Sequence, residues 1–469
     1  MKTIALWSFL ILFAVPQRSD AQDLRKVIDV VGELEDSLRA KIKDETRERN
    51  GDVAALRAEV TELRRQLDHG REDQARHTKD TVVLQQATKP PAPAAGISDG
   101  FPTLKVGALA QVQTFGGQEQ TTAAQDADPN YHSHWQRQLY VRRLRVLVGG
   151  NISRATSVFF ESDAPNIGKV SANGAKLSGV SMYVQDAYVQ HVFCPEAGLV
   201  AGLQLVGITR NSLQSAASLM ALNYGTYSFV QTGPLDNSVG RDLGFNARGF
   251  LLDERLEYRA GAFSGKNLNM YSPLRYTVRV NYDFLDREKG FFYTGTTLGK
   301  GQILAVGGGV DLQGSYGGYA IDAMADMPLF DAGSATISAS FSHLDGGGSA
   351  TDSTFFTGQI PRQNILFAEA GYFLGQWGLQ PFVKYEAQIV DAQVWKQVGA
   401  TSPASLDLQN KLRTGRRYGG GLNYYLNGHG ASFKVLYEHV LRNRLALDKT
   451  SWEPAGSNEL SFQVQYFVY

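Results

Sequence analysis

The stretch from Arg416 to Asn443 places the strongest constraint on how this chain can fold. On its first arm, Tyr418, Leu422 and Tyr424 lie on one face while polar and small residues occupy the other, which is the period of a β-strand. The tetrapeptide Asn427-Gly428-His429-Gly430 suits a tight reversal, and the alternation then resumes. Each arm has about ten to thirteen residues, enough for a tilted strand to cross a bilayer. The stretch therefore predicts a membrane β-hairpin.

Hairpins of this kind recur from residue 103 to the end of the chain, and the alternation predicts sixteen strands. Short connections, such as 195–196, follow even-numbered strands, and long ones, such as 207–241, follow odd-numbered strands. This parity is typical of bacterial barrels, which have short turns at one end and long loops at the other. Two connections depart from it, because 286–301 is long for a turn and 314–315 is short for a loop.

The first hundred residues have a different character and predict three further segments. A lysine followed by a short apolar run predicts a secretory signal peptide over 1–21. The charged stretch 22–87 has apolar residues spaced 3-4-3-4 and predicts a periplasmic α-helical coiled coil, with a single amphipathic helix on another surface as the alternative. A Pro-rich linker over 88–100 separates it from the barrel domain at 101–469. The predicted fold class is thus all-β: a sixteen-stranded antiparallel transmembrane barrel preceded by a coiled coil.

The composition excludes several other classes of protein. The formal net charge is zero, so the chain lacks the overall positive field that nucleic-acid binding requires. A mean hydropathy of -0.24 is too polar for a helical membrane protein, whereas 49 glycines and 11% aromatic residues suit a barrel. Cys194 is the only cysteine, which excludes an internal disulfide and a cysteine-based metal site. No serine or histidine lies in a catalytic motif, so we predict no enzyme activity, metal or cofactor.

Sixteen strands enclose a lumen too wide for side chains to fill, so a water-filled channel is expected. Because the apolar face of each strand must meet lipid, basic residues on the opposite face should line the channel and favour anions. Arg142 is expected to point outward near the rim. The alternative is that the inward cations pair with lumenal acids. The predicted anion path consists of Arg143, Arg145, Arg275, Arg279, Lys384, Arg413, Arg417 and Lys434.

The connection 207–241 is the longest in the barrel region, and a loop of this length usually has a function. We predict that it folds inward and narrows the pore, with Arg210 and Arg241 at the ends of the constriction. An external flap is the alternative.

Several short motifs occur in a characteristic order and spacing. They are Arg142-Arg143-Leu144-Arg145, Asp186-Ala187-Tyr188-Val189, Gly202-Leu203-Gln204, Arg241-Asp242-Leu243-Gly244 and the run from Gly421 to His429. In these motifs the chain resembles the phosphate-selective porin O and P family. The resemblance covers residues from about 101 to the end of the chain and implies a trimeric outer-membrane porin with anions, phosphate above all, as permeants.

The sequence therefore predicts a porin of the bacterial outer membrane that takes up small anions passively, with phosphate as one candidate. The expected partners are membrane lipid, anionic solutes, two further copies in a homotrimer, and a periplasmic or cell-wall contact through the coiled coil. Nucleic acid is not an expected partner. The alternative function is a general diffusion porin without anion specificity, in which the coiled coil serves as a structural tether.

Overall fold

The computed structural model describes residues 100–469 with internal gaps. The predicted signal peptide, the coiled coil and nearly all of the linker lie outside the described residues, and so does Arg413. Within the described part of the chain, no helix is both long and apolar enough to cross a membrane. The gaps are 171–173, 177–180, 230–239, 267–270, 330–332, 347–361, 392–413 and 449–450.

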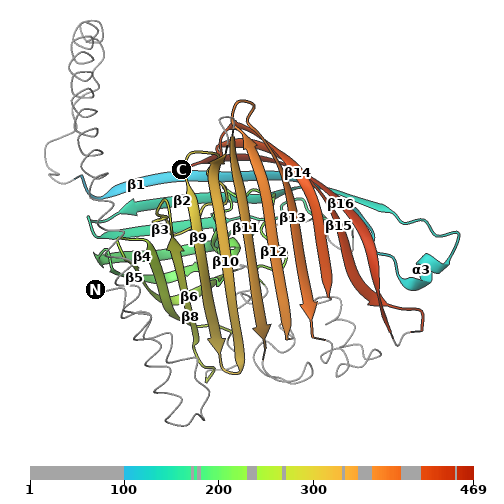
Figure 1. The fold of residues 1–469 in the computed structure, drawn as a ribbon, viewed down its shortest axis with the longest axis horizontal. Coiled ribbons are helices and arrows are strands. Elements are labelled where there is room, and N and C mark those ends of the chain that lie inside the picture. The colour runs from blue at the N-terminus through green and yellow to red at the C-terminus, as the bar shows by residue number, and fades with distance from the viewer. Residues whose placement is uncertain are drawn as a thin grey trace, which may run out of the picture. The chain divides into compact units, whose positions relative to one another are not determined.

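Sixteen antiparallel strands form a closed barrel, which confirms the all-β class and the number of strands (Figure 1). Each strand pairs with its neighbours in sequence, and β1 pairs with β16 to close the sheet. The strands are β1 (Thr103–Gln118), β2 (Trp135–Asn151), β3 (Thr156–Asp163), β4 (Tyr183–Cys194), β5 (Ala197–Leu205), β6 (Arg241–Leu251), β7 (Leu256–Phe263), β8 (Arg275–Asp283), β9 (Ile303–Gln313), β10 (Tyr316–Leu329), β11 (Gly333–Asp345), β12 (Gln363–Leu374), β13 (Leu379–Val390), β14 (Gly415–Asn427), β15 (Ala431–Leu445) and β16 (Trp452–Val468).

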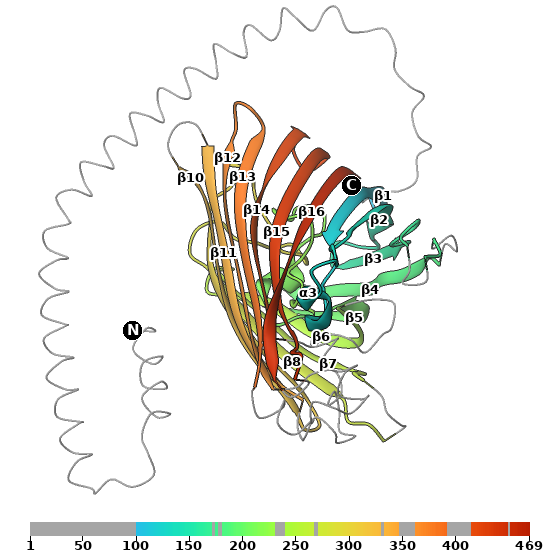
Figure 2. The same cartoon turned by 90° about the vertical axis from the view of Figure 1, so that its right-hand side faces the viewer.

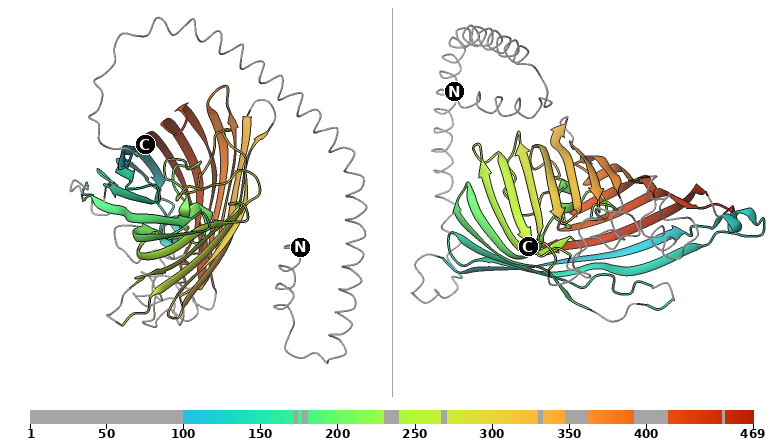
Figure 3. Two further views of the ribbon diagram at one scale, coloured as in Figure 1. Left: turned by 90° about the vertical axis from the view of Figure 1, so that its left-hand side faces the viewer. Right: turned by 90° about the horizontal axis from the view of Figure 1, so that it is seen from below.

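Closure pairs the first strand with the last. The pairing of β1 with β16 runs without interruption from Ala108 opposite Val468 to Gly117 opposite Glu459. Two further views show the continuous wall from its side and from below (Figure 3). A closed barrel leaves no unpaired strand edge, and it is one of the two backbone arrangements that hydrocarbon tolerates. The fold is therefore compatible with membrane insertion through its strands.

The barrel is apolar outside and polar inside, the reverse of a water-soluble protein. On β8, Tyr276, Val278 and Val280 are 53%, 45% and 46% exposed, whereas Arg275 and Arg279 are buried on the other face. Neighbouring side chains on a strand point to opposite faces, so this pattern separates one outer set from one lumenal set. The outer set suits lipid chains, and the lumenal set can form ion pairs and hydrogen bonds.

One strand boundary differs from the prediction by several residues. The sequence places a long connection at 443–458 and the last strand at 459–469, but β15 continues to Leu445 and β16 begins at Trp452. The added part of β16 is rich in polar and small residues, so it lacks the apolar alternation on which the prediction depended. Backbone pairing continues there because sheet hydrogen bonds do not require apolar side chains.

In Figure 1, the β1–β2 connection extends far outward, with α3 (Ala123–Ala127) at its tip.

Two connections turn into the barrel. The first is the β5–β6 connection, 206–240, which contains α4 (Arg210–Leu213) and appears as the green ribbon between the walls in Figure 2. The second is the β8–β9 connection, 284–302, the long join that departs from the parity rule. We call the end of the barrel from which 206–240 enters the loop end. The opposite end, which holds short turns such as 428–430, is the turn end.

Candidate functional site

The inward part of the β5–β6 connection crosses the lumen and touches widely separated strands. Ile208 is fully buried and packs with Tyr316 of β10. Met220 is also fully buried and packs with Phe382 of β13 and Leu436 of β15. These contacts hold the connection against β10, β13 and β15. The prediction of an inward fold for this connection therefore agrees with its position.

The β8–β9 connection meets the first segment inside the lumen. The backbone N–H of Ser215 donates to the Tyr293 carbonyl at 2.9 Å, and the Tyr293 N–H donates to the Leu213 carbonyl at 3.0 Å. An ion pair of 2.5 Å between Arg210 and Glu288 adds a charged contact. The two segments, which enter from opposite ends, are thus joined by backbone and side-chain bonds.

We call these inward segments, residues 207–229 and 284–302, the plug. The plug covers the wall formed by β6 to β10. Arg279 of that wall donates to Asp322 at 2.6 and 2.9 Å and to the Ile208 carbonyl of the plug at 2.8 Å. Its charge is therefore matched locally. Other arginines of this wall have carboxylate partners as well: Arg248 and Arg259 bind Glu257, and Arg275 binds Asp311 and Asp242.

The neighbouring wall, β1 to β5, retains open space. Three cavities lie along it, with volumes of about 600, 100 and 280 Å³. The largest, the loop-end cavity, reaches Pro165 and Tyr183, while the turn-end cavity of 280 Å³ reaches Thr103 and Ser157. The middle cavity shares its lining with both neighbours: Arg145, Tyr224 and Arg241 with the loop-end cavity, and Phe159 and Tyr469 with the turn-end cavity. The three spaces therefore adjoin one another along the wall.

Arg142 lines the loop-end cavity, so its predicted outward orientation is wrong. The pairing of β1 with β2 shifts at Gln111, which pairs with Arg143 and leaves Arg142 without a residue opposite it. Such a β-bulge interrupts the alternation of side chains along the strand. Arg142 can consequently reach inward, where its Nε donates to the Asn223 side-chain oxygen at 3.0 Å.

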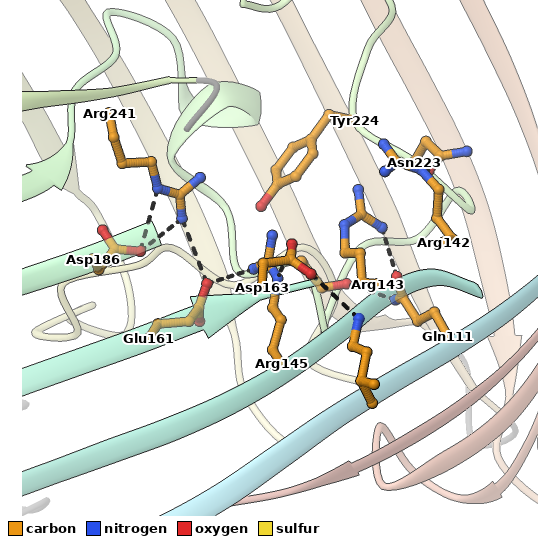
Figure 4. A network of polar contacts seen from close by, with 12 residues as sticks. Gln111, Arg142, Arg143, Arg145, Glu161, Asp163, Asp186, Asn223, Tyr224 and Arg241 are labelled. Carbon is orange, nitrogen blue, oxygen red and sulfur yellow. Dashed lines mark hydrogen bonds and ion pairs between the residues drawn. The ribbon is translucent and has the colours of Figure 1, made fainter. Parts of the chain in front are cut away.

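Carboxylates hold two arginines of the loop-end cavity (Figure 4). Arg145 donates to Glu161 at 2.7 Å and to Asp163 at 2.9 Å. Arg241 donates to Asp186 at 2.8 Å, and its guanidinium lies 3.8 Å from Glu161. The shared Glu161 links the two arginines into one network across β2, β3, β4 and β6. This network fixes the two guanidiniums where they line both the loop-end and the middle cavity.

Arg142 and Arg143 have neutral partners instead. The Arg143 guanidinium donates to the Gln111 side-chain oxygen at 2.6 Å and lies 5.5 Å from the centre of the Tyr224 ring. Asn223 supplies the oxygen that faces Arg142 (Figure 4). Within the described chain, neither guanidinium forms an ion pair with a carboxylate. Their positive charges are therefore available to an anion in the cavity.

The structure places the other described cations of the predicted path on the lumenal side, but none of them lines these three cavities. Arg210, expected at one end of the constriction, lies within the plug, and Arg241 begins β6 beside the loop-end cavity. Their role in a permeation path stays a prediction. The remaining strand cations have these partners: Glu386 for Lys384, Glu438 and Glu459 for Arg417, and the Leu219 carbonyl for Lys434.

The sequence prediction missed the neutral residues of the site, because it considered only positively charged residues. Gln111 and Asn223 bind the free guanidiniums through side-chain oxygens, and Tyr224 presents its ring to Arg143. The only signal for Tyr224 is its place at the end of a run of small and apolar residues within a long connection. Phe159 and Tyr469 gave no signal of a shared position, because they are far apart in the chain.

No family model matches this sequence, and no curated protein matches it. Several solved structures have a similar fold. Salmonella typhi OmpF in complex with daunomycin is 15% identical, with a TM-score of 0.49, and the match covers 77% of this chain and 97% of that one. The outer membrane channel DcaP of Acinetobacter baumannii is 11% identical, with 80% and 100% coverage and a TM-score of 0.45. An anion-selective porin from Comamonas acidovorans is 9% identical, with 78% and 100% coverage and a TM-score of 0.46.

Proposed function

We propose that this protein is an outer-membrane channel through which small anions diffuse passively, with phosphate as the first candidate to test. The observation that carries the proposal is the lining of the loop-end cavity, which contains four arginines and one carboxylate, Asp163. Two of the four, Arg142 and Arg143, have only neutral partners among the described residues. This lining favours negative solutes over positive ones.

The exposed apolar outer face supports a place in a membrane. Residues such as Leu104, Phe245 and Ile321 are 70%, 62% and 64% exposed. In water, so much exposed apolar surface would promote aggregation, whereas lipid chains accommodate it at little cost. Membrane barrels of this type belong to bacterial outer membranes, so we assign the chain to that location.

The route through the channel follows the β1–β5 wall. A solute enters the loop-end cavity, passes Arg145 and Arg241 at the shared boundary, and continues through the middle cavity to the turn-end cavity. The plug excludes the centre of the lumen, since its buried contacts join β10 to β1 and β2 on the far side of the barrel. Permeation by this side route explains why the unmatched arginines lie on β2.

Electrostatics gives this route a preference for anions. Inside a narrow space with low-dielectric walls, fixed charges raise the local concentration of the opposite ion. Cations paired with carboxylates at short distance contribute little to that field, whereas Arg142 and Arg143 contribute fully. Selectivity therefore depends on Arg142 and Arg143 and not on the total charge. The formal net charge of the whole chain is zero.

Single-channel recording in a planar bilayer tests the proposal. With a potassium chloride gradient, the wild-type reversal potential should show that anions permeate better than cations. The double variant Arg142→Gln/Arg143→Gln should lower this anion preference severalfold, because it removes two fixed charges from the entry to the route. A wild type without ion preference would favour the general diffusion porin, and an unchanged double variant would contradict the assigned site.

A matched control is Arg287→Gln, which removes an arginine that is 41% exposed and pairs with Glu254 away from the three cavities. It should leave the reversal potential unchanged. Phosphate is then titrated into the chloride solution. Block of the chloride current at low phosphate concentration would show that phosphate is held in the route, and its absence would restrict the function to anions in general.

A further inference from the structure

Aromatic side chains surround the middle cavity where it meets the turn-end cavity. Phe159 of β3 is central, with ring centres of Tyr188, Phe292 and Tyr469 at 5.5, 5.8 and 6.2 Å. Phe467 of β16 completes the lining of the middle cavity. We call these five residues the aromatic collar. They come from three strands, the plug and the last residue of the chain, so the collar exists only in the assembled barrel.

The C-terminal tyrosine belongs to the lumen. Ala108 pairs with Val468, so Tyr469 follows opposite Gly107, whose face of β1 points inward. A Cβ atom on Gly107 would lie 2.7 Å from the Tyr469 ring, and one on Gly149 of β2 would lie 1.9 Å from its hydroxyl oxygen. The two glycines thus form a recess that only residues without a side chain can provide. The sequence already shows that Tyr469 is out of phase with the lipid-facing residues of its strand.

The collar surrounds the smallest of the three adjoining spaces. The middle cavity has about 100 Å³, compared with about 600 Å³ at the loop end and 280 Å³ at the turn end. Because one water molecule occupies about 30 Å³, the middle cavity holds only a few waters. Its lining is mainly apolar and aromatic on the turn-end side. A hydrated solute therefore meets the smallest and least polar of the three spaces here.

We infer that the aromatic collar, with Phe159 and Tyr469 among its rings, is the size and hydration filter of the channel. The inference deepens the proposed function: the arginines of the loop-end cavity select by charge, and the collar, farther along the route, selects by size. Apolar constrictions oppose passage because a solute must shed water that the walls cannot replace. Small solutes that lose water easily pass, and bulky or strongly hydrated ones are held back.

The test uses neutral solutes first, so that it does not depend on charge selection. Polyethylene glycols of increasing size are added during single-channel recording, and the largest polymer that still enters the pore gives the exclusion limit. Phe159→Ala should raise the limit and increase single-channel conductance about twofold, because the central ring of the inferred filter is lost. Tyr469→Phe keeps the ring and should leave the limit unchanged, whereas Tyr469→Ala should raise it.

Permeation of a bulky anion provides the second measurement. The gluconate-to-chloride permeability ratio should rise in Phe159→Ala, while the preference for chloride over potassium stays at the wild-type value. An unchanged exclusion limit in Phe159→Ala that forms conducting channels would overturn the inference, whatever the fate of Tyr469→Ala. A wild type without anion preference would refute the proposed function alone, since the polymer measurement would still report the filter.

Discussion

Two neighbouring walls of the barrel, β1–β5 and β6–β10, use inward arginines in different ways. Arg143 on the β1–β5 wall and Arg279 on the β6–β10 wall are 2% and 3% exposed, so burial does not distinguish them. Their partners do. Arg279 binds the carboxylate of Asp322 and a carbonyl of the plug, whereas Arg143 binds the neutral Gln111 and lines a cavity of about 600 Å³. We therefore expect Arg279 to stabilise the fold and, under the proposed function, Arg143 to meet a solute.

This difference shows that an inward position does not make a residue part of a channel. Strand period decides which face a side chain takes, but the strands and connections across the lumen decide what it contacts. On the β6–β10 wall, the plug lies over the arginines and their acids. On the β1–β5 wall, the plug contributes Asn223 and Tyr224, which are neutral and leave the charge uncompensated.

The largest effect on stability is expected for Arg279→Gln, which tests whether the arginines of the β6–β10 wall stabilise the fold. The substitution leaves Asp322 buried with the Arg210 backbone N–H, at 3.0 Å, among its remaining donors. Removing one partner of a buried ion pair leaves an uncompensated charge and typically costs about 3–5 kcal/mol. We expect a decrease of that size in the free energy of unfolding, measured by urea denaturation in lipid vesicles with tryptophan fluorescence. The anion preference of the folded channel should not change.

The control removes both charges. Arg279→Met/Asp322→Leu replaces the pair by apolar side chains and should recover much of the lost stability, because no charge is left without a partner. If Arg279→Gln alone costs less than about 1 kcal/mol, the pair behaves like an exposed surface pair and the difference between the walls disappears.

Much of the barrel could be predicted because period-two alternation is strong and repeated. All sixteen strands occur where the sequence places them, and most boundaries agree within a few residues. The predicted beginning of β16 does not agree with the structure. Trp452 and the residues after it lie beyond the apolar band and show no apolar alternation. The parity of the connections correctly marked 284–302 as unusual, but its length alone could not show that it enters the lumen.

The candidate site was less predictable for two physical reasons. The orientation of Arg142 depends on a one-residue bulge, which no period in the sequence reveals. The availability of an inward cation depends on partners such as Asp322 or Gln111, which lie on other strands at sequence separations of 43 and 32 residues. Local patterns therefore give the face of each arginine but not its partner.

A second prediction concerns the anchor of the plug at the turn end, beside His429. Its Nε2–H donates to the Thr296 carbonyl at 2.8 Å, and its Nδ1 is buried without a hydrogen-bond partner. Burial lowers the pKa of His429 to about 4, with Lys434 and Lys300 acting in the same direction. Because the folded state resists protonation, stability is complete above about pH 6.5 and is lost as the pH falls toward 4. The loss reaches roughly 3 kcal/mol.

The matched variant is His429→Gln, which has no titrating group and keeps a side-chain donor for the Thr296 carbonyl. Urea midpoints of both proteins, measured from pH 7 to pH 4, isolate the histidine because other acidic groups titrate in both. The wild type should lose more stability than the variant over this range. Parallel curves would show that His429 is accessible to protons in the folded barrel and that the plug is not tightly anchored there.

The smallest effect on stability is expected for Arg143→Gln. Its stability loss can be compared directly with that of Arg279→Gln. The substitution removes one hydrogen bond to Gln111 and the contact with the Tyr224 ring. Tyr224 borders a cavity where water can replace the lost contact, and Gln111 keeps its hydrogen bonds to Gln465 and to the Ala216 carbonyl. It also removes a buried charge that has no carboxylate partner. We therefore expect a loss of about 1 kcal/mol or less in the urea experiment. A loss as large as that of Arg279→Gln would mean that Arg143 is a structural residue, and the two walls would then differ in their partners but not in their function.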